Sequence, residues 1–367
     1  MLNNNFAKWL NFPLLLVFTL MFNQEIQWNG RVKYEDGKKI IFNPSFPIYS
    51  NGSFFLRPEL TIGNDSKSGI PAFSSIKQVI LDEKGNIYIA DDKECCIKVF
   101  NDQGNYLKTI GKKGQGPGEF NGIISLSFSG NNLLVQDINL NLTFFSSEGV
   151  FIKKLFITKE HALLVKADRN ENILAQCAII GEKRKHRLIP YQGFILKKFD
   201  KNLKLLYNIS TFPSADPEDF DITRLPVWDI GASSQIIYGY PDKYQISVIK
   251  NEAKIQVERE YEKIRLNDEE SAAINKMIPV DASIQISSFH GAFSNIILDD
   301  SGKLFVRTWE KDRAGHFYYD IFDEEGRYIF KIPFSGNLQI VRKDKAFSVE
   351  EDDKDMPILR IYSIKWK

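Results

Sequence analysis

Residues 61–73 read TIGNDSKSGIPAF, and residues 109–120 read TIGKKGQGPGEF. Both stretches begin with Thr-Ile-Gly and end in Phe, and a strand pattern, a turn and a second strand pattern follow each of them. A glycine-rich loop holds a phosphate when a helix leaves it, because the helix N-terminus supplies N–H groups. Here the sequence after Phe120 alternates like a strand, and the earlier copy lacks most of the glycines. The pair predicts a joint between repeated units and not a nucleotide loop.

Units of four short apolar runs recur along the chain. The first, residues 76–110, has turns at 83–86, 91–94 and 102–105, and similar units are expected at 123–157, 163–210, 228–261 and 293–334. After residue 337 only three strand patterns remain, whereas the strand at 56–63 precedes the first unit and resembles its last strand. We therefore expect the N-terminal strand to complete the C-terminal sheet and close a ring, which protects strand edges.

This repeat predicts an all-β fold, a six-bladed β-propeller with four-stranded antiparallel blades. The absence of interleaved helices excludes parallel α/β folds, and two β-sandwich domains are the competing interpretation. Residues 28–55 form a lead-in whose hairpin turns at Asp36-Gly37, and residues 56–367 form the propeller. The only helix is expected within residues 267–279, capped by Asn267 or Asp268 and stopped by Pro279.

Composition and termini narrow the functional classes. The formal net charge of +1, from 48 basic and 47 acidic residues, gives no electrostatic case for nucleic acid. The apolar run at residues 12–22 predicts that residues 1–27 are a signal peptide or an N-terminal anchor, so the protein is expected to be exported, periplasmic or extracellular. Membrane contact is expected only through this segment, if it is not cleaved. Three cysteines make no disulfide framework, and at least two of them are expected to be buried free thiols.

The stretch from Gly85 to Phe120 resembles an NHL repeat, in which a strand, a turn with aspartate, a second strand and a glycine-rich exit into Phe recur. The wider pattern is similar to six-bladed propeller proteins that many bacteria export. NHL arginines and histidines at the start of the third strand are replaced by Glu94, Cys95 and Cys96, so NHL ligand contacts are not carried over. Propellers that resemble NHL proteins include zinc-dependent lyases, and calcium-dependent lactonases share the architecture.

In a propeller, the connections between blades share one face with the connections between second and third strands. Long connections are expected there at residues 181–187, 214–226, 267–290, 310–316 and 350–357, which predicts a binding face. The ligand-binding candidates on this face are Asp92, Asp137, His161, Trp228, Asp229, His290 and Arg313.

Each candidate has a plainer interpretation. Asp92 and Asp137 are typical turn caps, and isolated histidines are commonly hydrogen-bonded or exposed. The basic run at 182–187 could hold an anion or a polysaccharide carboxylate, or could simply be solvated, and the acidic run at 349–357 is similarly open. No cofactor is predicted and the metal is unknown, with a divalent cation, calcium, as the option that converging carboxylates would allow.

These sequence features leave three alternative functions. The first is a non-catalytic exported propeller that binds a protein, peptide or glycan on the face with the long connections. The second is a metal-assisted lyase or lactonase-type hydrolase acting at the channel mouth, for which the histidines are few. The third is an assembly role in an envelope complex. Fold alone does not separate them.

Overall fold

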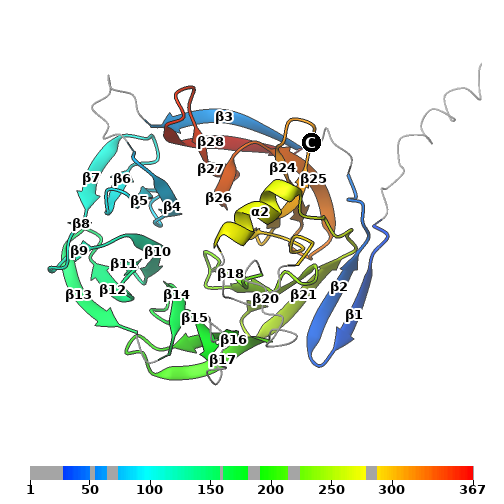
Figure 1. Cartoon of the computed structure of the whole chain (residues 1–367), viewed down its shortest axis with the longest axis horizontal. Coiled ribbons are helices and arrows are strands. Elements are labelled where there is room, and N and C mark those ends of the chain that lie inside the picture. The colour runs from blue at the N-terminus through cyan, green and yellow to red at the C-terminus, as the bar shows by residue number, and fades with distance from the viewer. Residues whose placement is uncertain are drawn as a thin grey trace, which may run out of the picture.

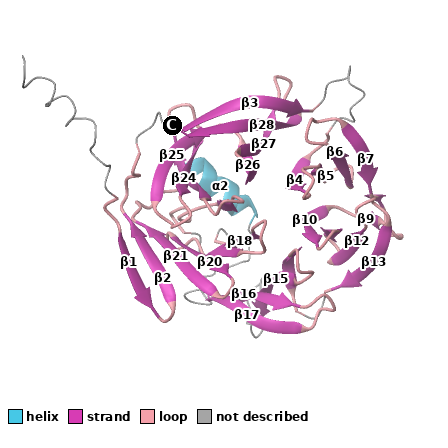
Figure 2. Cartoon of the chain, turned by 180° about the vertical axis from the view of Figure 1, so that it is seen from behind, coloured by secondary structure: helices cyan, strands magenta, loops and turns pink. Residues whose placement is uncertain are grey.

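Six blades, each with four antiparallel strands, stand around a central axis in the computed structural model of the chain (Figure 1). The structure describes residues 28–49, 54–63, 73–157, 160–180, 191–213, 224–277 and 287–366. The sheets follow one another around the ring in sequence order, and the view from behind shows the same closed circle (Figure 2). The predicted six-bladed propeller is confirmed.

Each blade runs from an innermost first strand to an outermost fourth strand. Blade 1 comprises β4 (Ile76–Leu81), β5 (Ile87–Asp91), β6 (Cys96–Phe100) and β7 (Tyr106–Ile110). Blade 2 comprises β10 (Ile123–Ser129), β11 (Asn132–Asp137), β12 (Asn141–Phe145) and β13 (Phe151–Phe156), and blade 3 comprises β14 (Ala162–Ala167), β15 (Ile173–Ile180), β16 (Tyr191–Phe199) and β17 (Leu205–Pro213).

Blades 4 and 5 follow the same order. Blade 4 comprises β18 (Val227–Ile230), β19 (Ile236–Gly239), β20 (Gln245–Lys250) and β21 (Ala253–Arg259), and blade 5 comprises β22 (Asn295–Leu298), β23 (Leu304–Lys311), β24 (Phe317–Phe322) and β25 (Tyr328–Phe334). Blade 6 is built from β26 (Asn337–Arg342), β27 (Lys345–Glu351), β28 (Pro357–Trp366) and, as its outermost strand, β3 (Phe54–Ile62), which pairs antiparallel with β28.

The lead-in, residues 28–55, contributes a hairpin that joins the sheet of blade 4, which the sequence did not indicate. Its hairpin, β1 (Arg31–Glu35) and β2 (Lys38–Asn43), turns at Asp36-Gly37 as expected, with φ of 48° and 72°. β2 then pairs parallel with β21, so the hairpin extends the sheet of blade 4 outward. Asn43 joins this edge to blade 5, because its Oδ1 accepts the N–H of Tyr328 at 2.8 Å and its Nδ2 donates to Gly326 O at 2.9 Å.

The glycine-rich stretch at residues 109–120 lies between blades 1 and 2. Two short parallel strands, β8 (Lys112–Lys113) and β9 (Glu119–Phe120), fold it back on itself. Glu119 Oε2 accepts the N–H of Gly116 at 2.9 Å, and a Cβ on Gly111 would meet the Phe120 ring at 2.3 Å. The stretch is a joint, as predicted, and its glycine at 111 lets the Phe120 ring pack against the backbone.

Two faces follow from the strand order. The loop face carries the connections between blades and those between second and third strands, and the turn face carries the other two connections of each blade. Most turns are five residues long and share one hydrogen-bond pattern. The side chain of the first residue of the turn accepts the backbone N–H groups of the third and fifth residues. In the turn from Asp323, Oδ1 accepts Glu325 N at 3.1 Å and Arg327 N at 2.8 Å, and Gly326 has a φ of 83°.

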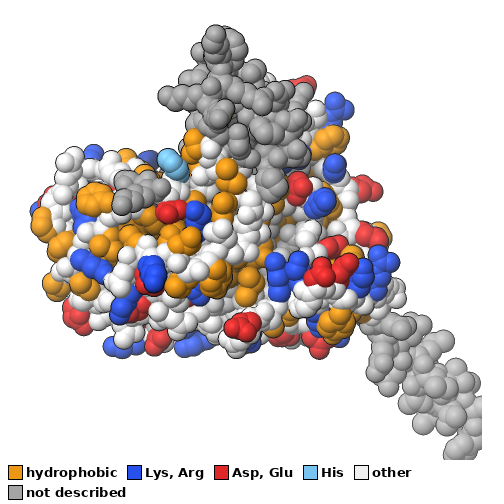
Figure 3. Space-filling view, turned by 90° about the horizontal axis from the view of Figure 1, so that it is seen from below, with side chains coloured by type: hydrophobic (Ala, Val, Ile, Leu, Met, Phe, Trp, Pro, Cys, Tyr) orange, Lys and Arg blue, Asp and Glu red, His pale blue; other side chains and the backbone are white. Residues whose placement is uncertain are grey.

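Acidic and basic side chains are interspersed over the surface that faces the viewer in the edge-on view of Figure 3.

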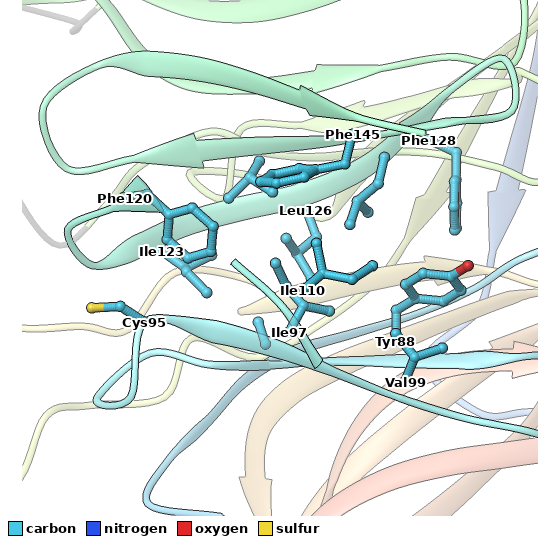
Figure 4. Packing of buried hydrophobic residues seen from close by; sticks show 13 residues of the cluster. Tyr88, Cys95, Ile97, Val99, Ile110, Phe120, Ile123, Leu126, Phe128 and Phe145 are labelled. Atoms are coloured by element: carbon cyan, nitrogen blue, oxygen red, sulfur yellow. The ribbon is translucent and has the colours of Figure 1, made fainter. Parts of the chain in front are cut away.

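The core lies between blades and not within one sheet. Tyr88, Ile97 and Val99 of blade 1 pack against Phe128 and Phe145 of blade 2, together with other apolar side chains (Figure 4). Tyr88 and Phe128 meet edge to face with ring centroids 5.2 Å apart. Because each blade buries one face against the next, the ring is held by contacts that close only when all six blades are present.

The helix α2 (Asp268–Met277) lies on the loop face between blades 4 and 5, toward the viewer in Figure 1. Asn267 Oδ1 accepts Glu270 N at 2.8 Å and Glu270 Oε2 accepts Asn267 N at 3.0 Å, which is a capping box. The expected helix and its cap at Asn267 are confirmed. Within the described residues no helix has the length and apolar character to cross a membrane. The predicted leader, residues 1–27, lies outside them.

Candidate ligand site at the channel mouth

The six innermost strands enclose a central channel of about 450 Å³. At its loop-face end, the wall contains Ser294, Asn295, Arg307, Asn337 and Gln339. At its turn-face end, it contains Leu81, Asp168, Arg169, Asp300 and Arg342. The channel is therefore polar at both ends, and of the seven predicted candidate residues its wall contains Asp229.

Lys166 and Asp229 form an ion pair across blades 3 and 4. Lys166 Nζ lies 2.7 Å from Asp229 Oδ1, and the Lys166 side chain is only 13% exposed. The ammonium group also lies 5.5 Å from the Trp228 ring centroid. Trp228 is buried and donates from Nε1 to Gln176 Oε1 at 2.9 Å. Asp229 thus faces the channel, whereas Trp228 joins the two blades.

Arg307 is a cation at the loop-face end of the channel, and it has no acidic partner among the described residues. Its guanidinium stacks on the Phe317 ring at 4.0 Å, and its Nε is buried without a hydrogen-bond partner among the described residues. The acidic neighbour in the same strand, Glu310, is already engaged by Lys331 and by Arg259. An unpaired guanidinium at a channel wall favours binding of an anionic group.

His290 lies on the loop face, in the connection between α2 and β22, and its ring is held by two side chains. Its Nε2 is 3.0 Å from Glu270 Oε2, its ring stacks on Trp309 at 4.2 Å, and its side chain is 9% exposed. The hydrogen bond from Asn267 N, followed by the proximity of His290, lowers the pKa of Glu270. The pair ties helix α2 to the second strand of blade 5.

The remaining predicted residues do not converge with these. Asp137 is buried and caps its own turn, accepting Asn139 N and Asn141 N at 2.9 and 3.0 Å. Asp92 Oδ1 accepts Ile123 N at 2.6 Å and so fixes the start of β10. His161 is exposed at a φ of 51°. Arg313 is exposed in a tight turn.

Two of the long connections expected on the loop face are tight turns. Residues 312–316 and 352–356 are five-residue turns, because β23, β24, β27 and β28 extend further than the sequence pattern indicated. His316 Nδ1 then lies 3.1 Å from Asp312 Oδ2, inside the turn. The expected connections at 181–187 and most of 214–226 lie outside the described residues.

Metal binding stays a prediction. Among the described residues, no group of three or more His, Cys, Asp or Glu side chains is placed to share an ion. The calcium option therefore has no assembled carboxylate site in that part of the chain.

Sequence reasoning missed Lys166 and Arg307 in the channel wall, and Glu270 and Trp309 as the partners of His290. These residues can be recognised only after each strand has been assigned to a blade. The innermost strands then mark the channel wall, and the end of each second strand marks its rim. Arg307 stands directly opposite Asn295 in the register, which places it at the loop-face end of blade 5.

Comparisons with known proteins agree with this architecture. Residues 72–157, the joint and the first two blades, match the family model DUF5128, described as a 6-bladed beta-propeller. The chain is a six-bladed β-propeller. A Bacteroides fragilis protein named as exported has a similar structure, with a TM-score of 0.58 and 13% identity, covering 89% of this chain and 99% of that one.

Two further structures are similar to this propeller. A DUF4221-family protein from Bacteroides vulgatus gives a TM-score of 0.58 at 13% identity, covering 87% of this chain and 100% of that one. Virginiamycin B lyase from Staphylococcus aureus aligns more loosely, with a TM-score of 0.47 at 10% identity, covering 84% of this chain and 99% of that one. No curated protein matches the sequence.

Proposed function

We propose that the protein is an exported, non-catalytic propeller whose loop-face channel mouth binds a protein segment, peptide or glycan that carries carboxylates. The observation that carries the proposal is Arg307, a cation at the channel wall without an acidic partner among the described residues and with a buried, unsatisfied Nε. A ligand carboxylate would supply the acidic partner that this guanidinium lacks.

Neighbouring groups fit the same ligand class. Lys311 is exposed and shares the Phe317 ring with Arg307, whereas Glu310 and Asp312 are occupied by other side chains. Ser294, Asn295 and Asn337 supply hydrogen-bonding groups at the wall. This combination of cations and neutral polar side chains suits a carboxylate with adjacent hydroxyl or amide groups.

Export is supported by two observations. Residues 12–22 have the apolar character of a signal-peptide core. A protein with a similar fold, from Bacteroides fragilis, is named as exported. Expression of the full chain with a C-terminal tag, followed by fractionation and N-terminal sequencing of the mature protein, tests this; a tagged protein retained in the cytoplasm with residues 1–27 intact would contradict it.

Binding is tested with two defined probes, trigalacturonate and hexaglutamate, titrated by calorimetry into the wild-type protein and the Arg307→Met variant. We expect saturable binding of at least one probe and a loss of tenfold or more in R307M. Arg327→Met, which removes an arginine already paired with Asp323 on the turn face, is the matched control and should bind as the wild type does. No saturable binding of either probe, or equal binding by R307M, would refute the proposal.

The His290–Glu270 pair favours a second candidate, a lyase or hydrolase. A carboxylate that orients an imidazole is an arrangement used in general acid–base catalysis. Activity screening with lactone and acidic oligosaccharide substrates tests it, because turnover that His290→Gln abolishes while leaving probe binding intact would replace the non-catalytic proposal.

A further inference from the structure

A second cavity, of about 370 Å³, lies on the turn face at the seam between blades 6 and 1, away from the candidate site at the loop face. We refer to it as the seam cleft. Its floor is apolar and comes from both blades, through Leu60, Leu81, Ile87, Phe347 and Ile361. Its rim carries four cations, Lys84, Arg342, Lys343 and Lys345, against the two acidic residues Glu59 and Asp102.

The rim cations differ in how they are satisfied. Lys345 Nζ pairs with Glu59 Oε2 at 3.1 Å, and this hydrogen bond lowers the pKa of Glu59. Arg342 donates from Nη1 to the carbonyl oxygens of Asp82 at 3.1 Å and Leu81 at 3.5 Å. Lys84 and Lys343 are exposed, and neither ammonium group has an acidic partner among the described residues. The cleft is therefore left with uncompensated positive charge.

Two arginines meet where the cleft adjoins the turn-face end of the channel, and one of them, Arg169, lines the channel and lies 3.8 Å from Glu83 Oε1. Arg169, from blade 3, donates from Nη2 to the same Leu81 carbonyl that Arg342 contacts, at 3.5 Å. Burial, and then the nearby Arg342, lowers the pKa of Arg169, with Glu83 acting in the opposite direction. Like charges held this close add to the positive potential at this end of the channel and favour an anion.

The turn that carries Lys343 has an unfavourable backbone conformation. Lys343 and Asp344 have φ of 52° and 55°, where side chains other than Gly, Asn and Asp are uncommon. The turn is held from blade 5, because Asp300 accepts the N–H of Lys343 at 3.1 Å. The turn therefore presents the exposed Lys343 side chain at the rim of the cleft.

We propose that the seam cleft binds a single-chain amphiphilic carboxylate, a medium-chain fatty acid, with its tail on the apolar floor and its carboxylate between Lys84, Arg342 and Lys343. The five floor side chains are apolar, and Gln103, the neutral polar side chain of the lining, is exposed, so the buried part of the ligand is a hydrocarbon. The volume lies at the low end of the range for small-ligand sites, which suits one chain and excludes a two-chain lipid. The uncompensated cations select an anionic head group.

Octanoate, 1-octanol and butyrate separate the contributions of charge and tail. We expect saturable one-to-one binding of octanoate by calorimetry, weakened by added salt, and at least tenfold weaker binding of both other probes. The Lys84→Glu/Lys343→Glu variant should lose tenfold or more of the octanoate affinity. Lys33→Glu/Lys250→Glu, on exposed lysines of the β1–β2 hairpin and blade 4, is the matched control and should bind normally.

Lys343→Gly separates binding from stability. It relieves the left-handed backbone and removes the ammonium group, so the melting temperature should rise while octanoate affinity falls. Glu252→Gly, in a blade 4 turn where Asn251 and Glu252 also have positive φ of 46° and 69°, should raise the melting temperature without changing octanoate binding.

Unsaturable octanoate binding, 1-octanol binding as tight as octanoate, or wild-type affinity in K84E/K343E or K343G would each overturn the inference. R307M should leave octanoate binding unchanged, because Arg307 lies at the other face; failure of the loop-face proposal is therefore distinguishable from failure of this one.

Discussion

Gln136 and Val165 join blades 2 and 3, because Gln136 Oε1 accepts the N–H of Val165 at 2.7 Å while Gln136 Nε2 donates to Leu163 O at 3.3 Å. The side chain thus pairs with the innermost strand of the next blade as a backbone would. Gln78 repeats the arrangement between blades 1 and 2, exchanging two hydrogen bonds with the backbone of Leu126 at 2.7 and 3.1 Å. Glutamine amides therefore supply hydrogen bonds between neighbouring sheets at two of the blade junctions.

Replacing Gln136 by Leu should destabilise the fold. The side chain is fully buried, and its loss leaves a strand N–H and a carbonyl without partners, which costs roughly 1–3 kcal/mol for each group. Urea unfolding should show a lower midpoint with an unchanged slope. Gln115→Leu, at an exposed glutamine, is the control and should shift the midpoint little.

The turn at residues 352–356 gives two opposite predictions. Asp352 Oδ1 accepts the N–H groups of Lys354 and Met356, both at 2.9 Å, so Asp352→Ala should destabilise the protein by about 1 kcal/mol. Asp355 is exposed with a φ of 58°, so Asp355→Gly should stabilise it by about 0.5–1 kcal/mol. Thermal unfolding of both variants checks this; a stabilising D352A or a destabilising D355G would contradict the account of the turn.

The charge of Asp352 should matter only above acidic pH. Hydrogen bonds from Met356 N and Lys354 N lower the pKa of Asp352 below its usual 3.8. A carboxyl with a lowered folded-state pKa contributes stability above its unfolded pKa, and this contribution is lost as the pH falls through the folded-state value. Asp352→Asn keeps the acceptor oxygen but not the charge. Its stability deficit should be present at pH 6 and disappear as the pH falls through the lowered folded-state pKa of Asp352, and a constant deficit would contradict this linkage.

Asp320 should be among the most sensitive positions in the fold. It is fully buried between blades 4 and 5, where Arg259 Nη1, Tyr244 Oη and Tyr328 Oη donate to it at 3.0, 2.7 and 2.5 Å. Burial raises the pKa of both tyrosines, so they stay protonated donors.

Asp320→Leu leaves the buried Arg259 without its main partner and should cost about 3–5 kcal/mol. Arg327→Ala, which removes a half-exposed arginine from its pair with Asp323, should cost about 1 kcal/mol or less. Chemical denaturation of the two variants compares them, and equal losses would refute the assignment of Asp320 as the junction's central acceptor.

The cysteines should resist modification in the folded protein. Cys95, Cys96 and Cys177 are free and buried, and burial raises the pKa of Cys96 and of Cys177 to about 11. At pH 8 few thiolates form, so an Ellman assay should label Cys96 and Cys177 rapidly only after unfolding. Fast labelling of either residue in the native state, identified by peptide mass spectrometry, would contradict their burial.

The fold could be predicted because its motifs recur along the sequence. The site could not, because its residues occur singly and belong to no motif. The Thr-Ile-Gly joints, the aspartate-headed turns and the Asn267–Glu270 cap each encode local geometry, so the sequence alone located the blades and the helix. The parallel pairing of β2 with β21 was invisible, because nothing in the lead-in sequence states which blade edge it will join.

The site was harder for the same reason. Trp228 and Asp229 are neighbours in sequence, yet one lies between blades and the other faces the channel, since successive strand residues point to opposite sides. Arg307 belongs to no sequence motif. It is distinguished by the lack of an acidic partner among the described residues, and only the folded structure reveals this.

Binding at the loop-face mouth is the central claim, and hydrogen–deuterium exchange with the acidic probe bound tests it most directly. With saturating trigalacturonate or hexaglutamate, peptides covering residues 304–317 and 335–342 should gain protection, and R307M should show none. Unchanged exchange in these peptides, or protection confined to the turn face around residues 82–86 and 101–105, would contradict the claim.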